Sequence, residues 1–372
     1  MRLTHTVLLS ALALALMQGC QNANAAEKKG SENTETAAAA PTPAPAPKPA
    51  AESNPQPVAA EVTPDVIHIA AVGDIMMGSN YPSASSLPPD DKAVLAGLRE
   101  YFEKPDLMFG NLEGVLLDKG GTPKPCGDSK FCFTFRMPEH YAQIFKDYGF
   151  DVMAVANNHA NDFGDGGRKS TAAALEKAGL FFAGSTEKPF TTFEKNGVKY
   201  GFLAVAPNKG CQELKAYDRN AEIVRELDKT CDIVIVSFHG GAEGEAYRHT
   251  PCKDENYLGA NRGNVCKLAR TCIDNGADIL LGHGPHVTRG VEIYKGRFIT
   301  YSMGNFCTYE KFGLSGNKGI GPIINLKVNK KGEFLEGYIV PTRQHGKGIP
   351  KFDEAGTVIK EIISLSKADF PN

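Results

Sequence analysis

The chain has 372 residues, of which 42% are hydrophobic and 23% charged, and its formal net charge is −2. This composition excludes a wholly disordered chain, a collagen-like chain and a polytopic membrane protein, and the charge gives no reason to expect nucleic-acid binding. A chain of this length has room for a large α/β domain with additional segments.

The first 25 residues predict an export signal. Arg2 precedes an uncharged apolar run over residues 7–17, which is too short to span a bilayer as a mature helix. Residues 17–20 resemble a lipobox that would make Cys20 a lipidated N-terminus, and ordinary cleavage after residues 23–25 is the alternative. We favour lipidation, and therefore a lipoprotein on the periplasmic face of a membrane. The glutamine that follows the cysteine slightly favours the outer membrane.

Residues 26–62 predict a disordered linker. Prolines recur between Pro41 and Pro57 among Ala, Thr and Lys, with almost no large apolar side chains. Such a segment buries too little surface to offset its chain entropy and favours extended polyproline II. We interpret it as a spacer that precedes a domain over residues 63–345, and we expect residues 346–372 to form a helical tail packed on that domain.

From Val66 onward, short apolar runs alternate with longer amphipathic segments. Strands are predicted at Val66–Val72, Asp106–Phe109, Asp151–Val155, Lys199–Val205, Asp232–Phe238 and Asp278–Leu281. Helices are predicted at Lys92–Phe102, Tyr141–Tyr148, Ser170–Ala178, Ile223–Leu227 and Val265–Ile273. This alternation predicts an α/β fold with a central sheet buried on both faces.

After residue 290 the pattern changes to hairpins. Their strands are predicted at Val291–Tyr294, Phe298–Ser302, Ile323–Val328 and Phe334–Val340. This change predicts a second, more antiparallel sheet packed against the first.

Eight cysteines remain once Cys20 is set aside. They are Cys126, Cys132, Cys211, Cys231, Cys252, Cys266, Cys272 and Cys307. An even number in an oxidising compartment permits four disulfides, and Cys126 and Cys132 flank a polar turn that a disulfide can close. Buried free thiols are the alternative. There is no Cys-x-x-Cys pair, so a thiolate zinc site is not predicted.

Side chains that can bind metals follow five of the predicted strands. They are Asp74, then Asn111 and Glu113, then Asn157, Asn158 and His159, then His239, then His283 and His286. Ligands of open α/β sheets bind outside the carboxyl ends of the strands, so we expect these side chains to meet at one rim. Carboxylate, amide oxygen and imidazole together suit Zn²⁺, Mn²⁺ or Fe²⁺. Four other histidines, all in the expected domain, are interpreted as structural: His68, His140, His249 and His345.

Together these motifs resemble the CapA family of poly-γ-glutamate capsule-synthesis proteins, whose domain is similar to a variant of the calcineurin-like metallophosphoesterases. The matching segments are Gly73–Gly78, Asn111–Gly114, Asn157–Gly164, Phe238–Glu243, Gly282–His286 and Tyr301–Phe306. The resemblance implies an α/β fold, a metallophosphoesterase-like sandwich of two mixed β-sheets flanked by helices.

The resemblance also implies a role for each matching residue. The ligands of one or two divalent ions (Mn, Zn, Fe or Mg) would be Asp74, Glu113, Asn158, His239, His283 and His286. His159 and Asp162 would be catalytic, with the histidine as acid at the scissile group. Four further residues would contact the substrate or hold the metal-binding side chains in place: Asn111, Asn157, Glu243 and Asn305. Met76 stands where the wider superfamily has a histidine, which removes an imidazole from one metal position. Gly240 stands where relatives have Trp, which would either open the pocket or remove an aromatic wall.

The implied activity is metal-dependent hydrolysis or transfer at a phosphate or acyl centre during synthesis, export or anchoring of the capsule polymer. The expected partners are an anionic polymer or phosphate-containing substrate, a membrane through the lipid anchor, and a capsule-synthesis complex, with no nucleic acid. Two alternatives stay open: a non-catalytic scaffold in which Arg136, Arg168 and Arg289 hold the polymer, and a general periplasmic metallophosphatase or nucleotidase. Residues 118–136 and 244–264 are expected to line the pocket.

Overall fold

Residues 65–102, 104–128 and 132–371 are described by the computed structural model of the chain. The expected signal segment over residues 1–25, the lipidation site Cys20 and the linker over residues 26–62 lie outside them. Within the described ranges, no helix is both long and apolar enough to cross a membrane.

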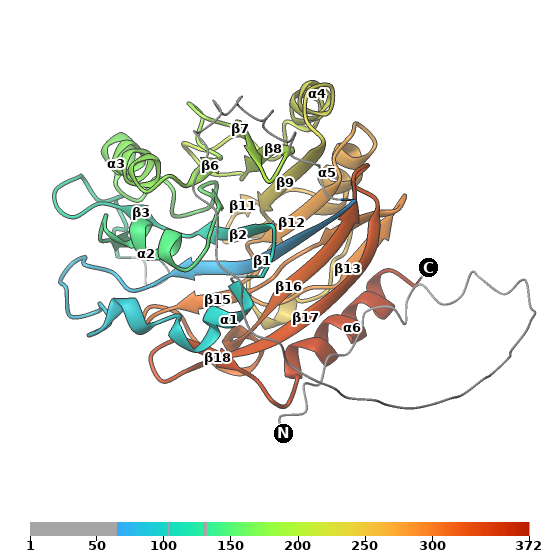
Figure 1. Ribbon diagram of the computed structural model, residues 1–372. Coiled ribbons are helices and arrows are strands. Elements are labelled where there is room, and N and C mark those ends of the chain that lie inside the picture. Colours follow the sequence, from blue (N-terminus) through green and yellow to red (C-terminus); the bar gives the residue numbers. More distant parts are fainter. Residues whose placement is uncertain (1–64, 103, 129–131, 372) are drawn as a thin grey trace, which may run out of the picture. The chain divides into compact units, whose positions relative to one another are not determined.

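Two mixed β-sheets form the centre of the fold (Figure 1). The first has the order β18-β17-β16-β1-β2-β5-β6, and β15 pairs with β1. Its strands are β1 (Val66–Met76), β2 (Leu107–Leu112), β5 (Val152–Ala154), β6 (Phe181–Ala183), β15 (Asn305–Thr308), β16 (Ile320–Asn329), β17 (Phe334–His345) and β18 (Ile349–Phe352). The second has the order β13-β14-β12-β9-β8-β7. Its strands are β7 (Phe190–Lys195), β8 (Val198–Val205), β9 (Ile233–His239), β12 (Ile279–His283), β13 (Val291–Tyr294) and β14 (Arg297–Thr300).

The second sheet has a parallel centre and two antiparallel edges, whereas the first is antiparallel only on the side of β16, β17 and β18 and is parallel out to its other edge at β6. The strands β1, β2, β5 and β6 run parallel, as do β8, β9, β12 and β14. The predicted α/β fold with two mixed sheets is therefore confirmed. The assignment of every hairpin after residue 290 to one second sheet is wrong, because β16 pairs antiparallel with β1 along Val66–Val72 and carries β17 and β18 into the first sheet. Only β13 and β14 join the second sheet.

Apolar side chains fill the space between the two sheets and both outer faces. Phe109 of β2 and Phe202 of β8 belong to the layer between the sheets, with ring centroids 5.9 Å apart. The outer face of the first sheet is covered by α1 (Arg99–Phe102), α2 (Tyr141–Asp147) and α3 (Gly164–Lys177). The outer face of the second is covered by α4 (Tyr217–Asp228) and α5 (Val265–Ile273), as Figure 1 shows. Strands buried on both faces explain the near-continuous apolar runs in the sequence.

The last helix, α6 (Thr357–Asp369), follows β18 and closes one end of the core. Val358, Ile359 and Ile362 on this helix belong to the hydrophobic layer between the sheets. The Ser366 hydroxyl also accepts a 2.8 Å hydrogen bond from the backbone N–H of Val291 in β13. The chain beyond residue 345 therefore contributes both a strand and core side chains.

Helix boundaries differ from the predictions where the first turn is polar. A continuous helix over residues 92–102 is wrong, because 3₁₀ turns at Asp91–Ala93 and Ala96–Leu98 precede the short α1. Gly97 lies in this stretch, and glycine costs about 1 kcal/mol relative to alanine inside a helix. The helices α3 and α4 each begin six residues before the predicted start, in polar turns that carry no apolar spacing.

Two disulfides form, Cys126–Cys132 and Cys252–Cys266. The first is the predicted closure of the polar turn and is confirmed. Four further cysteines are free thiols, namely Cys211, Cys231, Cys272 and Cys307. Among the described residues, two disulfides therefore form instead of the four that eight cysteines permit.

Gly73 is expected to tolerate no side chain, because β1 lies against the backbone of Gly304 there. An added Cβ would come within 2.0 Å of the Gly304 carbonyl oxygen, which accepts a 2.9 Å hydrogen bond from Asp74 N. Gly73→Ala should lower the free energy of unfolding in urea by about 2–3 kcal/mol. Gly97→Ala, whose Cβ would meet nothing within 4 Å, should not lower it and should raise it by up to about 1 kcal/mol. Equal losses in the two variants would contradict the clash.

Candidate metal centre and catalytic site

Asp74 sits inside β1, at the point where the register with both neighbouring strands shifts. It pairs with Asn111 of β2 and Asn305 of β15. The strand continues to Met76, beyond the end predicted at Val72. An irregularity of this kind reorients one side chain of a strand, and it leaves the Asp74 carboxylate wholly buried.

The Asp74 carboxylate connects the two sheets. Its Oδ1 accepts a 2.8 Å hydrogen bond from Asn111 Nδ2 and lies 3.1 Å from Nδ1 of His283, at the end of β12. Its Oδ2 lies 3.1 Å from Nδ1 of His286. Burial alone would raise the pKa of Asp74, but the hydrogen bonds and positive charge of the two histidines outweigh it and hold this pKa well below its usual value. The residue is therefore an anion in the centre of the protein.

Glu113, one residue after β2, is a buried carboxylate without a hydrogen-bond partner. Neither of its oxygens is paired, and the Nε2 atom of His286 lies 3.5 Å away. Ligand atoms of Asp74, Glu113 and His286 all lie within 4.8 Å of one another. Burial raises the pKa of Glu113 well above its usual value. Such an uncompensated group is costly unless a cation or proton satisfies it.

Further donor atoms around this cluster are also buried and unpartnered. They are both ring nitrogens of His239, Nε2 of His283 and Oδ1 of Asn158. The rings of His239 and His286 lie 6.1 Å apart. Burial lowers the pKa of His239 well below its usual value, so this imidazole is neutral and offers a lone pair. Carboxylate oxygens, an amide oxygen and neutral imidazoles together fit a divalent cation such as Zn²⁺, Mn²⁺ or Fe²⁺.

His286 itself is held in a left-handed backbone conformation, with φ +57°. Non-glycine residues in this region cost about 1–3 kcal/mol and persist where the surroundings fix them. The surroundings here are Asp74 and Asn305, whose Oδ1 lies 3.0 Å from His286 Nδ1. The strain supports a functional interpretation of this histidine.

His159 and Asp162 form a buried pair on the other side of the cluster. His159 Nδ1 lies 2.7 Å from Asp162 Oδ2, which also accepts a 2.6 Å hydrogen bond from Phe135 N. Lys124 Nζ lies 2.5 Å from the other oxygen of Asp162. With the carboxylate ionised, Nδ1 carries the proton and donates it, so Nε2 of His159 is left for a substrate. The backbone N–H of His159 donates to Asn157 Oδ1 at 3.1 Å.

The pair and the cluster are linked by an amide chain and by a stack of rings. Asn157 Nδ2 donates to Asn111 Oδ1 at 3.3 Å, and Asn111 in turn donates to Asp74. The ring of Phe135 lies 4.0 Å from that of His159 and 5.1 Å from that of Phe312, which lies 5.2 Å from the ring of His286. Burial lowers the pKa of His159, and the charge of Asp162 opposes this only in part.

Two cationic residues of the site carry no signal in the sequence. Arg262 Nη2 donates to Glu243 Oε1 at 2.5 Å, and Lys124 pairs with Asp162. Both lie in the segments that were expected to line the pocket, but nothing in their spacing identifies them. Asn305 Nδ2 donates to the Lys318 carbonyl oxygen at 3.1 Å.

The three arginines proposed to hold a polymer have partners within the fold. Arg289 is wholly buried and pairs with Glu255 through two hydrogen bonds of 2.8 and 2.7 Å, so its predicted role is wrong. Arg136 Nε donates to Asn80 Oδ1 at 2.6 Å, and Arg168 pairs with a neighbouring aspartate on α3. Buried arginines need such partners, and the sequence does not reveal them.

The packing of Met76 and Gly240 explains which residue stands at each of these two positions. Met76 is buried in the outer hydrophobic core of the first sheet. A Cβ at Gly240 would lie 2.6 Å from Leu214 Cδ1 and 3.0 Å from the Arg262 carbonyl oxygen. The expectation that this glycine opens the pocket is therefore wrong, because neighbouring residues fill the space.

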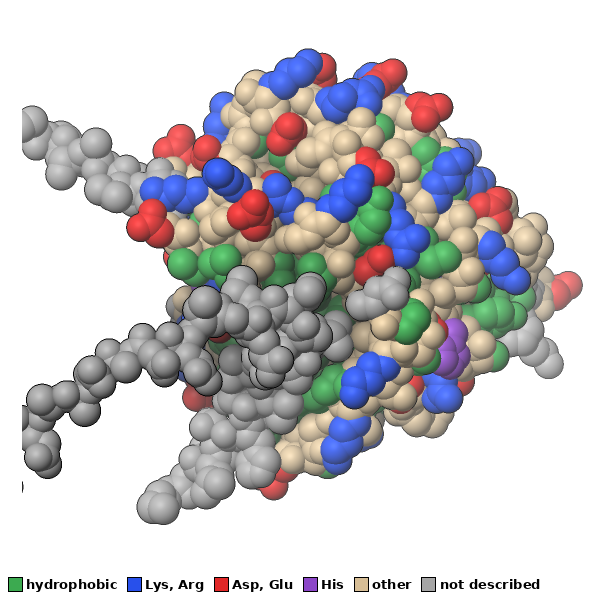
Figure 2. Space-filling view, turned by 90° about the vertical axis from the view of Figure 1, so that its right-hand side faces the viewer, with side chains coloured by type: hydrophobic (Ala, Val, Ile, Leu, Met, Phe, Trp, Pro, Cys, Tyr) green, Lys and Arg blue, Asp and Glu red, His purple; other side chains and the backbone are tan. Residues whose placement is uncertain are grey.

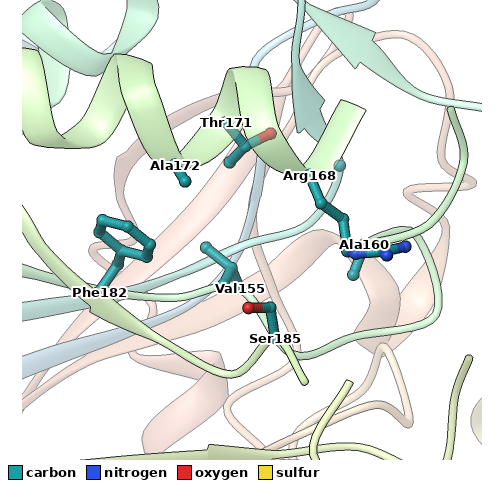
Figure 3. A pocket seen from close by; sticks show the side chains of 8 residues that line it. Val155, Ala160, Arg168, Thr171, Ala172, Phe182 and Ser185 are labelled. Carbon is teal, nitrogen blue, oxygen red and sulfur yellow. The ribbon is translucent and has the colours of Figure 1, made fainter. Parts of the chain in front are cut away.

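A small cavity lies under α3, next to the residue that follows His159 (Figure 3). Arg168, Thr171 and Ala172 of α3 line it together with Ala160 and Phe182. Its volume is about 20 Å³, which is room for about one water molecule. It is therefore too small to hold a substrate.

The metal-free protein is expected to lose stability as the pH rises above about 6.5. Burial lowers the pKa of His286, but the charges of Glu113 and Asp74 outweigh it and raise this pKa from 6.5 to about 10. The folded state then keeps a proton that the unfolded state releases, so this stabilisation is complete below pH 6.5 and is lost as pH rises through about 10. Urea midpoints between pH 6 and 10 with a chelator present measure it. His286→Asn should show a shallower decline, and parallel curves would contradict the assignment.

Comparison with known proteins gives one family and several relatives. Residues 68–310 match the family model described as "Bacterial capsule synthesis protein PGA_cap". The "PGA biosynthesis protein CapA" of Bacillus subtilis is 31% identical over 258 residues, which are 65% of this chain and 63% of that protein. The "Capsule biosynthesis protein CapA" of Bacillus anthracis is 29% identical over 256 residues, 63% of this chain and 58% of that protein. The chain thus matches less than two thirds of the length of either relative.

Solved structures are similar at a lower level. A hypothetical protein from Thermus thermophilus aligns with a TM-score of 0.46 and 16% identity, covering 75% of this chain and all of that one. A putative 5'-nucleotidase from Staphylococcus aureus aligns with a TM-score of 0.43 and 15% identity, covering 80% of this chain and 58% of that one. Similarity at this level does not carry the chemistry of either protein to this chain.

Proposed function

Because this chain belongs to the PGA_cap family of bacterial capsule synthesis proteins, we propose that it is a metal-dependent hydrolase or transferase in the production of an acidic capsule polymer. The membership confirms the resemblance drawn from the motifs. The reaction would take place at a phosphate or acyl centre. The observation that supports it best is the group of buried, unpartnered donor atoms of Glu113, His239 and His283 around the Asp74 carboxylate.

Six residues would hold one or two divalent ions: Asp74, Glu113, Asn158, His239, His283 and His286. When bound, such an ion supplies Lewis acidity to the scissile group and to water. Nε2 of His159, which carries no proton in the neutral ring, would first take a proton from the attacking water and would then give that proton to the leaving oxygen. Asp162 holds the other ring nitrogen at 2.7 Å and stabilises the charged imidazole. Asn111 and Asn157 fix the two parts of the site relative to each other.

The proposed location is the periplasmic face of a membrane, with export directed by residues 1–25 and lipidation at Cys20. Residues 26–62 would hold the domain away from the membrane. Two disulfides support an oxidising compartment. Metabolic labelling with a fatty acid, comparing the natural chain with Cys20→Ser, tests this part, and label that persists in the variant would contradict it.

Elemental analysis tests the proposed metal centre. The full chain, purified without chelator, is expected to carry about one or two divalent ions, and added metal should restore phosphoester or acyl turnover after chelation. Asp165→Asn is the matched control, because Asp165 is exposed and lies on α3, outside the cluster. No metal uptake on reconstitution, or turnover that is independent of metal, would overturn the proposal.

A further inference from the structure

A cleft of about 380 Å³ opens beside the His159–Asp162 pair. Among the described residues, its lining includes two lysines, Lys124 and Lys311, and no carboxylate. Its walls are aromatic and proline side chains: Tyr81, Pro82, Pro123, Phe133 and Phe135. The Cys126–Cys132 disulfide forms another part of the lining. A cleft with positive and apolar groups but no acid suits a ligand that is both anionic and partly apolar.

The cleft is adjacent to the proposed chemistry through shared residues. Phe135 lines it, and the centroid of the Phe135 ring lies 4.0 Å from that of His159, with the two rings tilted by 31°. Lys124 also lines it, and its ammonium lies 2.5 Å from Asp162. A ligand bound in the cleft would therefore lie against the same ring that supports the catalytic histidine.

Lys311 is the cation of this cleft that is available to a ligand. Lys124 is already paired with Asp162, whereas the side chain of Lys311 has no ion pair or hydrogen bond among the described residues. Lys311 is half-buried, in the loop after β15. The adjacent carboxylate, Glu310, is paired with Lys347 at 2.8 Å. An ammonium that is partly removed from water and has no ion pair of its own gains from an anionic ligand.

The face of the molecule drawn in Figure 2 gives no substitute for such a local site. The face drawn in Figure 2 carries Lys and Arg side chains interspersed with Asp and Glu side chains. Opposite charges close together cancel at a distance. An acidic polymer that approached this face would meet no broad positive field, so its recognition would depend on specific pockets.

We propose that this cleft is a subsite for a polymer segment that carries a carboxylate on each repeat, placed next to the metal centre. A carboxylate would pair with Lys311, and the methylene groups between the carboxylates would pack on Phe133 and Tyr81. Phe133 is 49% exposed and so has apolar surface to cover. This inference rests on the proposed function for the identity of the polymer. Binding of the polymer in the subsite does not require metal.

The test is a titration of the full-length protein with a pentamer of γ-linked glutamate, with a chelator present. Lys311→Ala is expected to weaken binding about threefold to tenfold, and Lys311→Glu more strongly, as for a partly exposed charge-assisted contact. Lys360→Ala is the matched control, because Lys360 is an exposed lysine of α6. The same pentamer with its carboxylates converted to amides should not bind measurably, and added salt should weaken the binding of the acidic pentamer.

Three outcomes decide between the alternatives. Binding that is lost in the Lys311 variants and kept in the Lys360 variant supports the subsite, even if elemental analysis finds no metal and the proposed function fails. Equal affinities in all variants would overturn the subsite and leave the metal centre standing. Displacement of the pentamer by inorganic phosphate, together with phosphate binding that depends on Lys311, would assign the cleft to phosphate and also overturn it.

Discussion

Glu113→Gln is expected to abolish the stabilisation that divalent metal gives to the folded protein. In the natural chain, metal at about 100 times its dissociation constant should raise the free energy of unfolding by about 2.7 kcal/mol. Glu113 offers two buried oxygens without a hydrogen bond, one of them 3.5 Å from His286 Nε2, and an amide replaces this anion by a neutral group of the same shape. Thermal unfolding with metal, and again with a chelator, measures both states.

Without metal, Glu113→Gln should no longer lower the free energy of unfolding relative to the natural protein. Burial raises the pKa of Glu113 well above its usual value, which means that the carboxylate is destabilising where it has no cation. The metal-free variant should therefore be at least as stable as the metal-free natural protein. Asp165→Asn, which changes an exposed carboxylate, should leave the response to metal intact. A Glu113→Gln protein that is still stabilised by metal would remove this carboxylate from the proposed ligands.

His159→Ala is expected to lower kcat by about 10²- to 10⁴-fold while the metal content stays unchanged. General acid catalysis contributes rate factors of this size, and the imidazole is buried with its Nδ1 fixed by Asp162 at 2.7 Å. Asp162→Asn should act through the same histidine by releasing its orientation. Steady-state turnover of a phosphoester, measured beside elemental analysis of the same samples, separates catalysis from metal binding.

His140→Ala is the matched control for this substitution. His140 is an exposed histidine that pairs with Asp91 at 2.6 Å, near the start of α2. It should leave kcat within about twofold, as expected of surface changes away from a site. Equal activity of the His159 variant and the natural protein would exclude the proposed acid and favour a scaffold.

The sequence predicts the fold where the signal is local, and fails where distant partners decide. Near-continuous apolar runs show that the strands are buried on both faces, but the single central sheet predicted from them is wrong, because β1, β2 and β5 belong to one sheet and β8, β9 and β12 to the other. Which sheet receives β16 depends on its pairing with β1, more than two hundred residues away in the chain. Apolar spacing carries no information about such a pairing.

The candidate site likewise contains some residues that the sequence predicts and others that it does not. Residues at the ends of strands, such as Asp74 and His283, are visible as candidates because parallel strands deliver their carboxyl ends to one rim. Lys124 and Arg262 are not visible, because their importance comes from single contacts with Asp162 and Glu243. The predicted role of Arg289 in holding a polymer is wrong for the same reason, because the contact with its partner Glu255 forms only in the folded chain.

The position of Asp74 between the sheets has a consequence for how this protein can change over time. One carboxylate contacts histidines that belong to the opposite half of the molecule, so the atoms proposed for chemistry also join the two halves. A descendant that gave up turnover would still need this junction for its architecture. Retention of these residues in such a descendant would therefore be poor evidence that it remains an enzyme.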